Sequence, residues 1–215
     1  MYSEAGAMVY MTGNVSMHAK ARGGIGGGLK RMITGESFFI TNYTASGGNG
    51  VVGCGGHLPG KIMAIDVGES TWLAQRDSFL VAESTVNMEL AFQRKMGSAF
   101  FGGEGFVLQK FTGEGLCFIH AAGDFTVIDL KPGQQYKIST SHAVAWEDTV
   151  NYDIQSSGSL KTALFSGEGL FVTTLTGPGK IVIQSLSLQD LAGALHPFMP
   201  KPSRSSPTIS LGGRN

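Results

Sequence analysis

A motif that recurs at one fixed spacing constrains the fold of this chain more than any other feature. The stretch Glu-X-Thr-Val-Asn at residues 83–87 returns at 147–151, and Gly-Glu-Gly at 103–105 returns at 167–169. In both cases the copies are 64 residues apart, so they align without a gap. A gapless match at one period indicates a duplicated structural unit.

The N-terminal segment reads as a third, damaged copy of this unit. We align Glu4 with the glutamate that opens each later copy, and Glu36 with the glutamate of each Gly-Glu-Gly motif. These glutamates are 21 residues apart in both later copies and 32 apart in the first, so the first copy has 11 extra residues. We place them in a glycine-rich insertion within residues 13–31. No turn-and-strand segment precedes Glu4, so we expect the opening strand to be absent.

The repeat predicts an all-β protein built from units of about 64 residues. Short runs of aromatic and β-branched residues that end at glycine are typical of strands. Their polar and apolar residues alternate irregularly, which indicates strands covered on both faces. The stretches around Pro132-Gly133 and around Gly177-Pro178-Gly179 each predict a β-hairpin. We expect the units at residues 1–66, 67–129 and 130–196.

One longer helix and a tail are predicted at the C-terminal end. Ser187 followed three residues later by Asp190 has the spacing of an N-terminal capping box, so we expect a helix over 187–195. The tail, residues 197–215, is rich in proline, serine and glycine. Such a composition buries little apolar surface, so we expect this tail to be disordered.

Composition excludes several classes of protein. The 215 residues include 16 basic and 16 acidic side chains, so no net charge attracts nucleic acid or anionic membranes. No apolar run is long enough to span a membrane, and no signal peptide is evident. The two cysteines do not form a disulfide framework, and we expect a cytoplasmic protein with reduced thiols.

Several motifs occur in the order found in one known family. They are Glu4-Ala-Gly-Ala-Met8, the glycine-rich stretch 23–31 leading to Gly35-Glu36-Ser37, the repeated Gly-Glu-Gly, and Pro132-Gly133. Over residues 1–196 the chain resembles the family "altered inheritance of mitochondria, number twenty-four" and its bacterial relatives. The resemblance implies a TRAP-like β-sandwich, the fold of the tryptophan-sensing RNA attenuator, repeated within the chain and assembled as a homo-oligomer. It implies no established enzymatic activity.

The glycine-rich insertion is the first candidate site. Successive glycines allow backbone N–H groups to turn toward an anion, and two basic residues end the stretch. Its spacing matches neither the Walker pattern nor the dinucleotide fingerprint. A tightly packed excursion at a subunit contact is the alternative. The candidate anion-binding residues are Gly24, Gly26, Gly27, Gly28, Lys30 and Arg31.

Two Cys-X-X-His units form a second candidate site. Cys54 with His57, and Cys117 with His120, would supply four ligands of the kind that zinc prefers. Side chains three apart on a strand point to opposite faces, which argues against such a site. Buried cysteines and hydrogen-bonded histidines are the favoured alternative.

The repeated glutamates are interpreted as structural. Glu83, Glu104, Glu147 and Glu168 recur with the repeat. A catalytic carboxylate needs one special environment, whereas a carboxylate that accepts backbone N–H groups is needed at every copy of a turn. We therefore predict turn-stabilising carboxylates rather than paired acid and base groups.

Together these observations favour a non-enzymatic scaffold or binding protein that forms a homo-oligomer. Three units in each chain favour a trimer. One alternative is a small-molecule or anion-binding protein that uses residues 23–31. Another, by analogy with the TRAP-like fold alone, is an RNA-binding module, although basic residues form no stripe. No motif predicts a cofactor.

Overall fold

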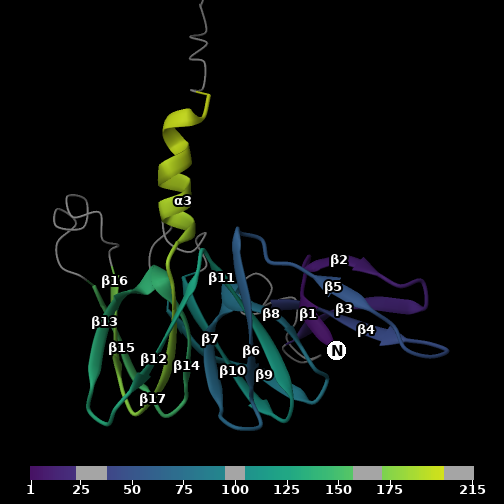
Figure 1. Ribbon diagram of the computed structural model, residues 1–215, viewed down its shortest axis with the longest axis horizontal. Coiled ribbons are helices and arrows are strands. Elements are labelled where there is room, and N and C mark those ends of the chain that lie inside the picture. Colours follow the sequence, from purple (N-terminus) through teal and green to yellow (C-terminus); the bar gives the residue numbers. More distant parts are fainter. Residues whose placement is uncertain (23–37, 95–104, 157–170, 201–215) are drawn as a thin grey trace, which may run out of the picture.

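The structure is a computed structural model that describes residues 1–22, 38–94, 105–156 and 171–200. The described chain is mainly β, as predicted, with one short C-terminal helix (Figure 1). In the described part no helix is long and apolar enough to cross a membrane.

The strands fall into three consecutive groups, which we call unit 1, unit 2 and unit 3. Unit 1 contains β1 (Tyr2–Glu4), β2 (Met8–Met11), β3 (Val15–Arg22), β4 (Phe38–Ala45) and β5 (Val52–Cys54). Unit 2 contains β6 (Gly60–Asp66), β7 (Trp72–Gln75), β8 (Phe79–Ala82), β9 (Val86–Arg94), β10 (Phe106–Gly113) and β11 (Leu116–Ala122). Unit 3 contains β12 (Phe125–Leu130), β13 (Gln135–Ser139), β14 (Ala143–Glu147), β15 (Asn151–Ser156), β16 (Phe171–Thr176) and β17 (Gly179–Gln184).

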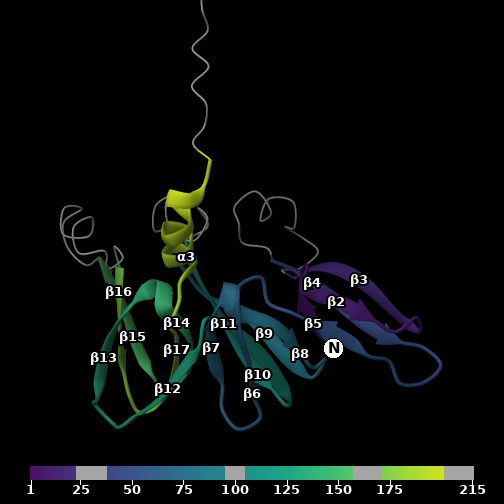
Figure 2. The same cartoon turned by 45° about the horizontal axis from the view of Figure 1, so that its top comes forward.

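Consecutive units share their sheets. Junction sheet 1–2 has the order β3-β4-β1-β8-β11-β6, with three strands from each unit. Junction sheet 2–3 has the equivalent order β9-β10-β7-β14-β17-β12. An N-terminal half-sheet (β2-β5) and a C-terminal half-sheet (β13-β16-β15) lie at opposite ends of the row of units, as Figures 1 and 2 show.

These pairings move the unit boundaries from those expected. Residues 60–66 were assigned to the first repeat, yet they form β6, which pairs with β11 of unit 2. Residues 125–130 form β12, which pairs with β17 of unit 3. Units 2 and 3 therefore begin near Gly60 and Phe125. Each unit is defined by strand pairing, whereas the expected boundaries followed the turns that open the later copies.

The register also corrects the alignment of the first copy. Glu4 lies opposite Ile40, as Gln75 lies opposite Leu108 in unit 2. On its other edge β1 pairs with β8, as β7 pairs with β14. Strand β1 is thus the opening strand that was expected to be absent, and Glu4 is not the counterpart of Glu83. Among the described residues, unit 1 lacks only a counterpart of β6 and β12.

Thr12 is the true counterpart of the repeated glutamates. Glu83 Oε2 accepts the backbone N–H of Leu116 at 3.1 Å, and Glu147 Oε2 accepts that of Lys180 at 2.8 Å. At the equivalent place in unit 1, Thr12 Oγ1 accepts the backbone N–H of Val51 at 3.1 Å. The backbone carbonyl of each of these three residues also accepts the N–H of the residue three positions later, at 3.0, 3.1 and 2.9 Å in units 1, 2 and 3. All three side chains hold the same turn. Glu104 and Glu168 lie outside the described residues.

The corrected alignment shortens the insertion. Phe38 follows Val15 by 23 residues, and Phe106 follows Val86 by 20, so three extra residues remain instead of 11. Residues 13–22 belong to the turn before β3 and to β3 itself, which forms a hairpin with β4. What remains of the predicted insertion falls within 23–37, outside the described residues.

Two predicted hairpins are wrong. Strand β12 pairs with β17 while β13 pairs with β16, so the turn at Pro132-Gly133 carries the chain from one sheet to another. The turn at Gly177 does the same between β16 and β17. The two turns bind each other: Gly133 N–H donates to the Gly177 carbonyl at 3.2 Å, and Gly177 N–H donates to the Gln134 carbonyl at 2.9 Å.

Three hydrophobic clusters lie between successive sheets, one for each unit. The cluster of unit 2 joins Phe79 and Ile119 of junction sheet 1–2 to Phe111 and Val144 of junction sheet 2–3. Those of units 3 and 1 lie on either side of it. Strands in the middle of the row, such as β7, β8 and most of β14, are therefore buried on both faces, as the irregular alternation predicted.

The C-terminal helix is confirmed with its capping box. Helix α3 (Leu188–Leu195) begins after Ser187, whose Oγ accepts the N–H of Asp190 while the Asp190 carboxylate accepts the N–H of Ser187, both at 3.1 Å. The helix stands away from the sheets in Figure 1, and none of its residues is buried.

The turn held by Glu83 predicts that two glycines, both with positive φ, differ in how much stability is lost when alanine replaces them. Gly115 has φ +111°, and a Cβ there would overlap the Glu83 carboxylate. Gly133 has φ +77° and open space around it. In urea unfolding, Gly133→Ala should lower the free energy of unfolding by about 1 kcal/mol and Gly115→Ala by about 2–4 kcal/mol. Adding Glu83→Ala to Gly115→Ala should cost less than the sum of the two single changes. Equal effects at the two glycines would contradict this account of the turn.

Candidate functional site

The structure describes the predicted metal ligands but not the predicted anion-binding residues. Gly24, Gly26, Gly27, Gly28, Lys30 and Arg31 all lie outside the described residues, so the anion site stays a prediction. The four residues of the two Cys-X-X-His units are described and lie in different surroundings. Within the described ranges no three His, Cys, Asp or Glu side chains group closely enough to hold a metal ion.

Each member of the Cys-X-X-His units has its own local contact. Cys117 is fully buried in the unit 2 cluster, and burial raises the pKa of its thiol. Cys54 packs beside the small unit 1 cluster, and partial burial raises its pKa as well. His120 Nε2 lies 3.0 Å from the Leu58 carbonyl, whereas His57 Nε2 lies 3.6 Å from Glu4 Oε2. The four side chains thus have separate local contacts.

Glu4 is a titratable group that the sequence did not single out for its chemistry. Burial, followed by the charge of Asp77, raises its pKa to about 7, and Arg76 partly opposes this shift. Its side chain remains 28% exposed and faces His57. Glu4 therefore changes its charge near neutral pH at the junction of units 1 and 2. A sequence motif cannot reveal this because Asp77 and Arg76 come from the next unit.

Side chains from both units secure each junction sheet. Tyr2 Oη donates to the Val86 carbonyl at 3.0 Å across the first junction. Across the second, Ser78 Oγ donates to the Val144 carbonyl at 3.2 Å, and Lys110 Nζ lies 2.7 Å from Asp148 Oδ2. The junctions thus combine backbone pairing with apolar burial and polar contacts.

The exposed surface with the clearest departure from the repeat is β2. This strand is the counterpart of β8 and β14, since β5 pairs with it as β11 and β17 pair with theirs, including the same register shift. Leu80 and Val81 of β8, and the equivalent Val144 and Ala145 of β14, pack against the preceding unit and are at most 8% exposed. Their counterparts in unit 1, Val9 and Tyr10, are 69% and 61% exposed.

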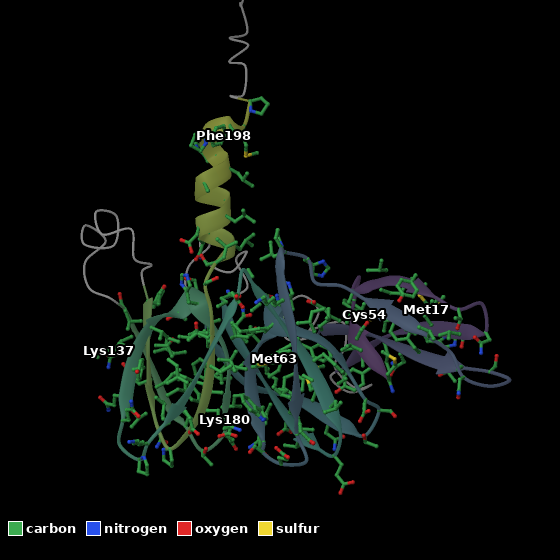
Figure 3. The ribbon with its side chains drawn as sticks, in the orientation of Figure 1. Met17, Cys54, Met63, Lys137, Lys180 and Phe198 are labelled. Atoms are coloured by element: carbon green, nitrogen blue, oxygen red, sulfur yellow. The ribbon has the colours of Figure 1, made fainter. Side chains whose placement is uncertain are left out.

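In the described part of the chain, the opposite end of the row is also open. Strand β13 is the counterpart of β1 and β7 by its register with β16. Tyr2 and Leu73, at equivalent positions of β1 and β7, are buried, whereas Lys137 of β13 is exposed. Figure 3 shows Lys137 at one end of the molecule and Cys54, beside β2, toward the other.

Apolar side chains also protrude from the C-terminal helix. Leu188, Leu195 and Phe198 are between 51% and 85% exposed, and Phe198 lies near the outer end of the helix in Figure 3. The candidate functional surfaces in the described part of the chain are therefore the exposed residues of β2, of β13 and of the C-terminal segment. The sequence did not identify them, because an exposed valine or tyrosine reads like any other strand residue until its equivalents are seen buried.

Comparisons with known proteins agree with the resemblance found in the sequence. The model of the family described as mitochondrial biogenesis AIM24 matches residues 1–186. An uncharacterised protein of Streptococcus pyogenes is 34% identical over 211 residues, which cover 94% of this chain and 84% of that protein. A crystal structure of a Streptococcus pyogenes protein matches with a TM-score of 0.77 and 30% identity, covering 92% of this chain and 88% of the other.

The raised pKa of Glu4 predicts a pH dependence of stability. A carboxyl whose pKa is higher when folded favours the folded state below pH 4.5, and this contribution is lost as the pH rises through about 7. Between pH 4.5 and 8, the free energy of unfolding should fall by about 1–3 kcal/mol more in the natural chain than in Glu4→Gln. Urea unfolding across this range measures the difference. Glu69→Gln, a change at an exposed glutamate, should leave the pH profile unchanged, and a parallel profile for Glu4→Gln would contradict the prediction.

Proposed function

This chain belongs to the mitochondrial biogenesis AIM24 family, and we propose that it is a non-enzymatic scaffold or binding protein that works as a homo-oligomer. The observation that carries the proposal is the exposure of Val9 and Tyr10 on a strand whose equivalents are buried in units 2 and 3. Apolar residues at an open strand edge are a hazard for a monomer and suit a surface covered by another chain.

The use of the repeated polar residues supports a structural role. Glu83 and Glu147 each bind the backbone of a turn, and Ser70 Oγ also donates to Glu147 at 3.0 Å. Side chains engaged in holding turns are poorly placed to act as acids or bases on a substrate. Val9 and Tyr10 are exposed, whereas their equivalents in units 2 and 3 are buried. Assembly with another chain would explain this difference directly, and a catalytic role would not.

The proposal extends to fold kinship, assembly and location. We assign the units to the TRAP-like β-sandwich class, and three units in each chain favour a trimer. Two free cysteines suit a cytoplasmic protein. RNA binding is the less favoured alternative, because the exposed strand residues that depart from the repeat, Val9, Tyr10 and Lys137, include a single basic residue and so form no basic stripe.

The first test is the molar mass in solution. We expect the natural chain to show a mass that is a multiple of 22.6 kDa by light scattering over a concentration series. Tyr10→Lys places a charge in the surface to be covered and should weaken association about tenfold or more. Ile62→Lys is the matched control, since Ile62 is a 47% exposed residue of β6 at a different sheet edge. A natural chain that stays at 22.6 kDa at every concentration would overturn the proposal.

The anion-binding alternative is separated by thermal unfolding. If the scaffold proposal is correct, phosphate should produce no specific rise in melting temperature beyond that given by an equal ionic strength of chloride. The double variant Lys30→Ala with Arg31→Ala should behave in the same way. A phosphate-dependent rise in the natural chain that disappears in the double variant would favour an anion site in residues 23–31.

A further inference from the structure

We infer that the N-terminal half-sheet of one copy pairs with the C-terminal half-sheet of a second copy, so that β2 lies antiparallel to β13 of the other chain. The inference rests on the proposed self-association and specifies which surfaces meet. Each half-sheet is one side of a junction sheet that occurs twice within the chain. Joined together, they would form a third junction sheet in which only the counterpart of β6 and β12 is missing.

The pairing within the chain supplies the rule. Strands β1, β7 and β13 form one class of equivalent strands, and β2, β8 and β14 form another. Strand β7 of unit 2 pairs antiparallel with β14 of unit 3, and β1 of unit 1 pairs antiparallel with β8 of unit 2. In the described part of the chain, the third member of this strand class, β13, pairs only with β16. The third member of the other class, β2, pairs only with β5 there. The two unpaired edges thus belong to the two strand classes that pair with each other within the chain.

The register follows from the same equivalences. Tyr2 lies opposite Ala82 and Leu73 lies opposite Trp146. The corresponding residues of β13 and β2 are Lys137 and Met11, so these two should lie opposite each other between chains. By the same rule, Ile138 should lie opposite Tyr10, as Ala74 lies opposite Ala145.

Burial and geometry favour a second copy over closure within one chain. The half-sheets lie at opposite ends of the row of units, so one chain does not bring them together (Figure 1). A partner unit 3 would cover Val9 and Tyr10 as unit 1 covers Leu80 and Val81. Lys137 can extend its aliphatic stem over Met11 and keep its ammonium group in water, because unit 1 has no described strand beyond β5 in that sheet.

The contact is heterologous, which distinguishes it from a twofold dimer. Two different surfaces meet, so each chain has one free end of each kind until the assembly closes into a ring or continues as a filament. A twofold dimer would instead pair β2 with β2, or β13 with β13. Cysteine pairs distinguish these arrangements because opposite residues on antiparallel strands lie about 4.5–5.5 Å apart at Cβ.

The test is disulfide formation between variants of the full chain. All variants carry Cys54→Ala, because Cys54 lies on β5 next to β2, whereas Cys117 is fully buried. Under mild oxidation, Lys137→Cys mixed with Met11→Cys should give a covalent dimer, and the double variant should give longer covalent species. Neither single variant should crosslink by itself. Circular dichroism and thermal unfolding of each variant check that it is folded.

A register control uses the same two strands. Mixing Lys137→Cys with Val9→Cys should crosslink at least about tenfold more slowly, since Val9 lies two residues away from Met11 along β2. Crosslinking of Met11→Cys or Lys137→Cys alone would overturn the inference in favour of a twofold contact. An oligomeric natural chain without any of these crosslinks would overturn the inference while leaving the proposed scaffold intact. A monomeric chain would overturn both, with Lys137 then acting as a charge that protects the β13 edge.

Discussion

Backbone pairing across unit boundaries is the interaction on which the rest of this structure depends. A half-sheet of three strands ends in a row of N–H and C=O groups that need partners, and burial makes unpaired groups costly. The next unit supplies those partners, so β1 pairs with β8 and β7 pairs with β14. The small residues Ala74 and Ala145 face each other at the centre of the second junction and are fully buried.

Sharing a sheet also determines where the hydrophobic clusters lie. Because each junction sheet belongs to two units, one face of it closes one unit and the other face closes the next. Trp72 and Leu73 are neighbours on β7, yet they contribute to the clusters of units 2 and 3 respectively. No unit can therefore be removed from the middle of the row without exposing apolar residues on both sides. The units behave as a continuous array rather than as separate domains.

The turn that follows β2, β8 and β14 shows which contact the three units share. A side-chain oxygen must accept one backbone N–H so that the turn stays bound to the start of the third strand that follows it, which is β5, β11 or β17. A glutamate does this in units 2 and 3, and a threonine does it in unit 1. The requirement is for an acceptor at one place in space. Charge is not needed, so residue identity can change while the contact persists.

The two ends of the row of units carry the exposed residues that depart from the repeat. The open edges of β2 and β13 differ in character, one apolar and one carrying an exposed lysine, and this asymmetry suits two unlike surfaces that meet. Near the first junction, Glu4 adds a group whose charge changes close to neutral pH. The Glu4 side chain is partly buried beside charges from unit 2, so we expect the stability of that junction to depend on pH.

The sequence by itself determined the duplication, the mainly β character, the capped helix after Ser187 and the family, because these depend on residue type and local spacing. It misplaced Glu4, since matching identical letters cannot find that Thr12 makes the same hydrogen bond. It read the turns at Pro132 and Gly177 as hairpins, since a tight turn has the same composition whether the chain stays in one sheet or crosses to another. Only the tertiary structure decided the register and the sharing of sheets, because strand pairing joins residues far apart in the sequence. For the same reason, only the structure separated Val9 and Tyr10 from their buried equivalents: exposure is a property of what lies against a strand.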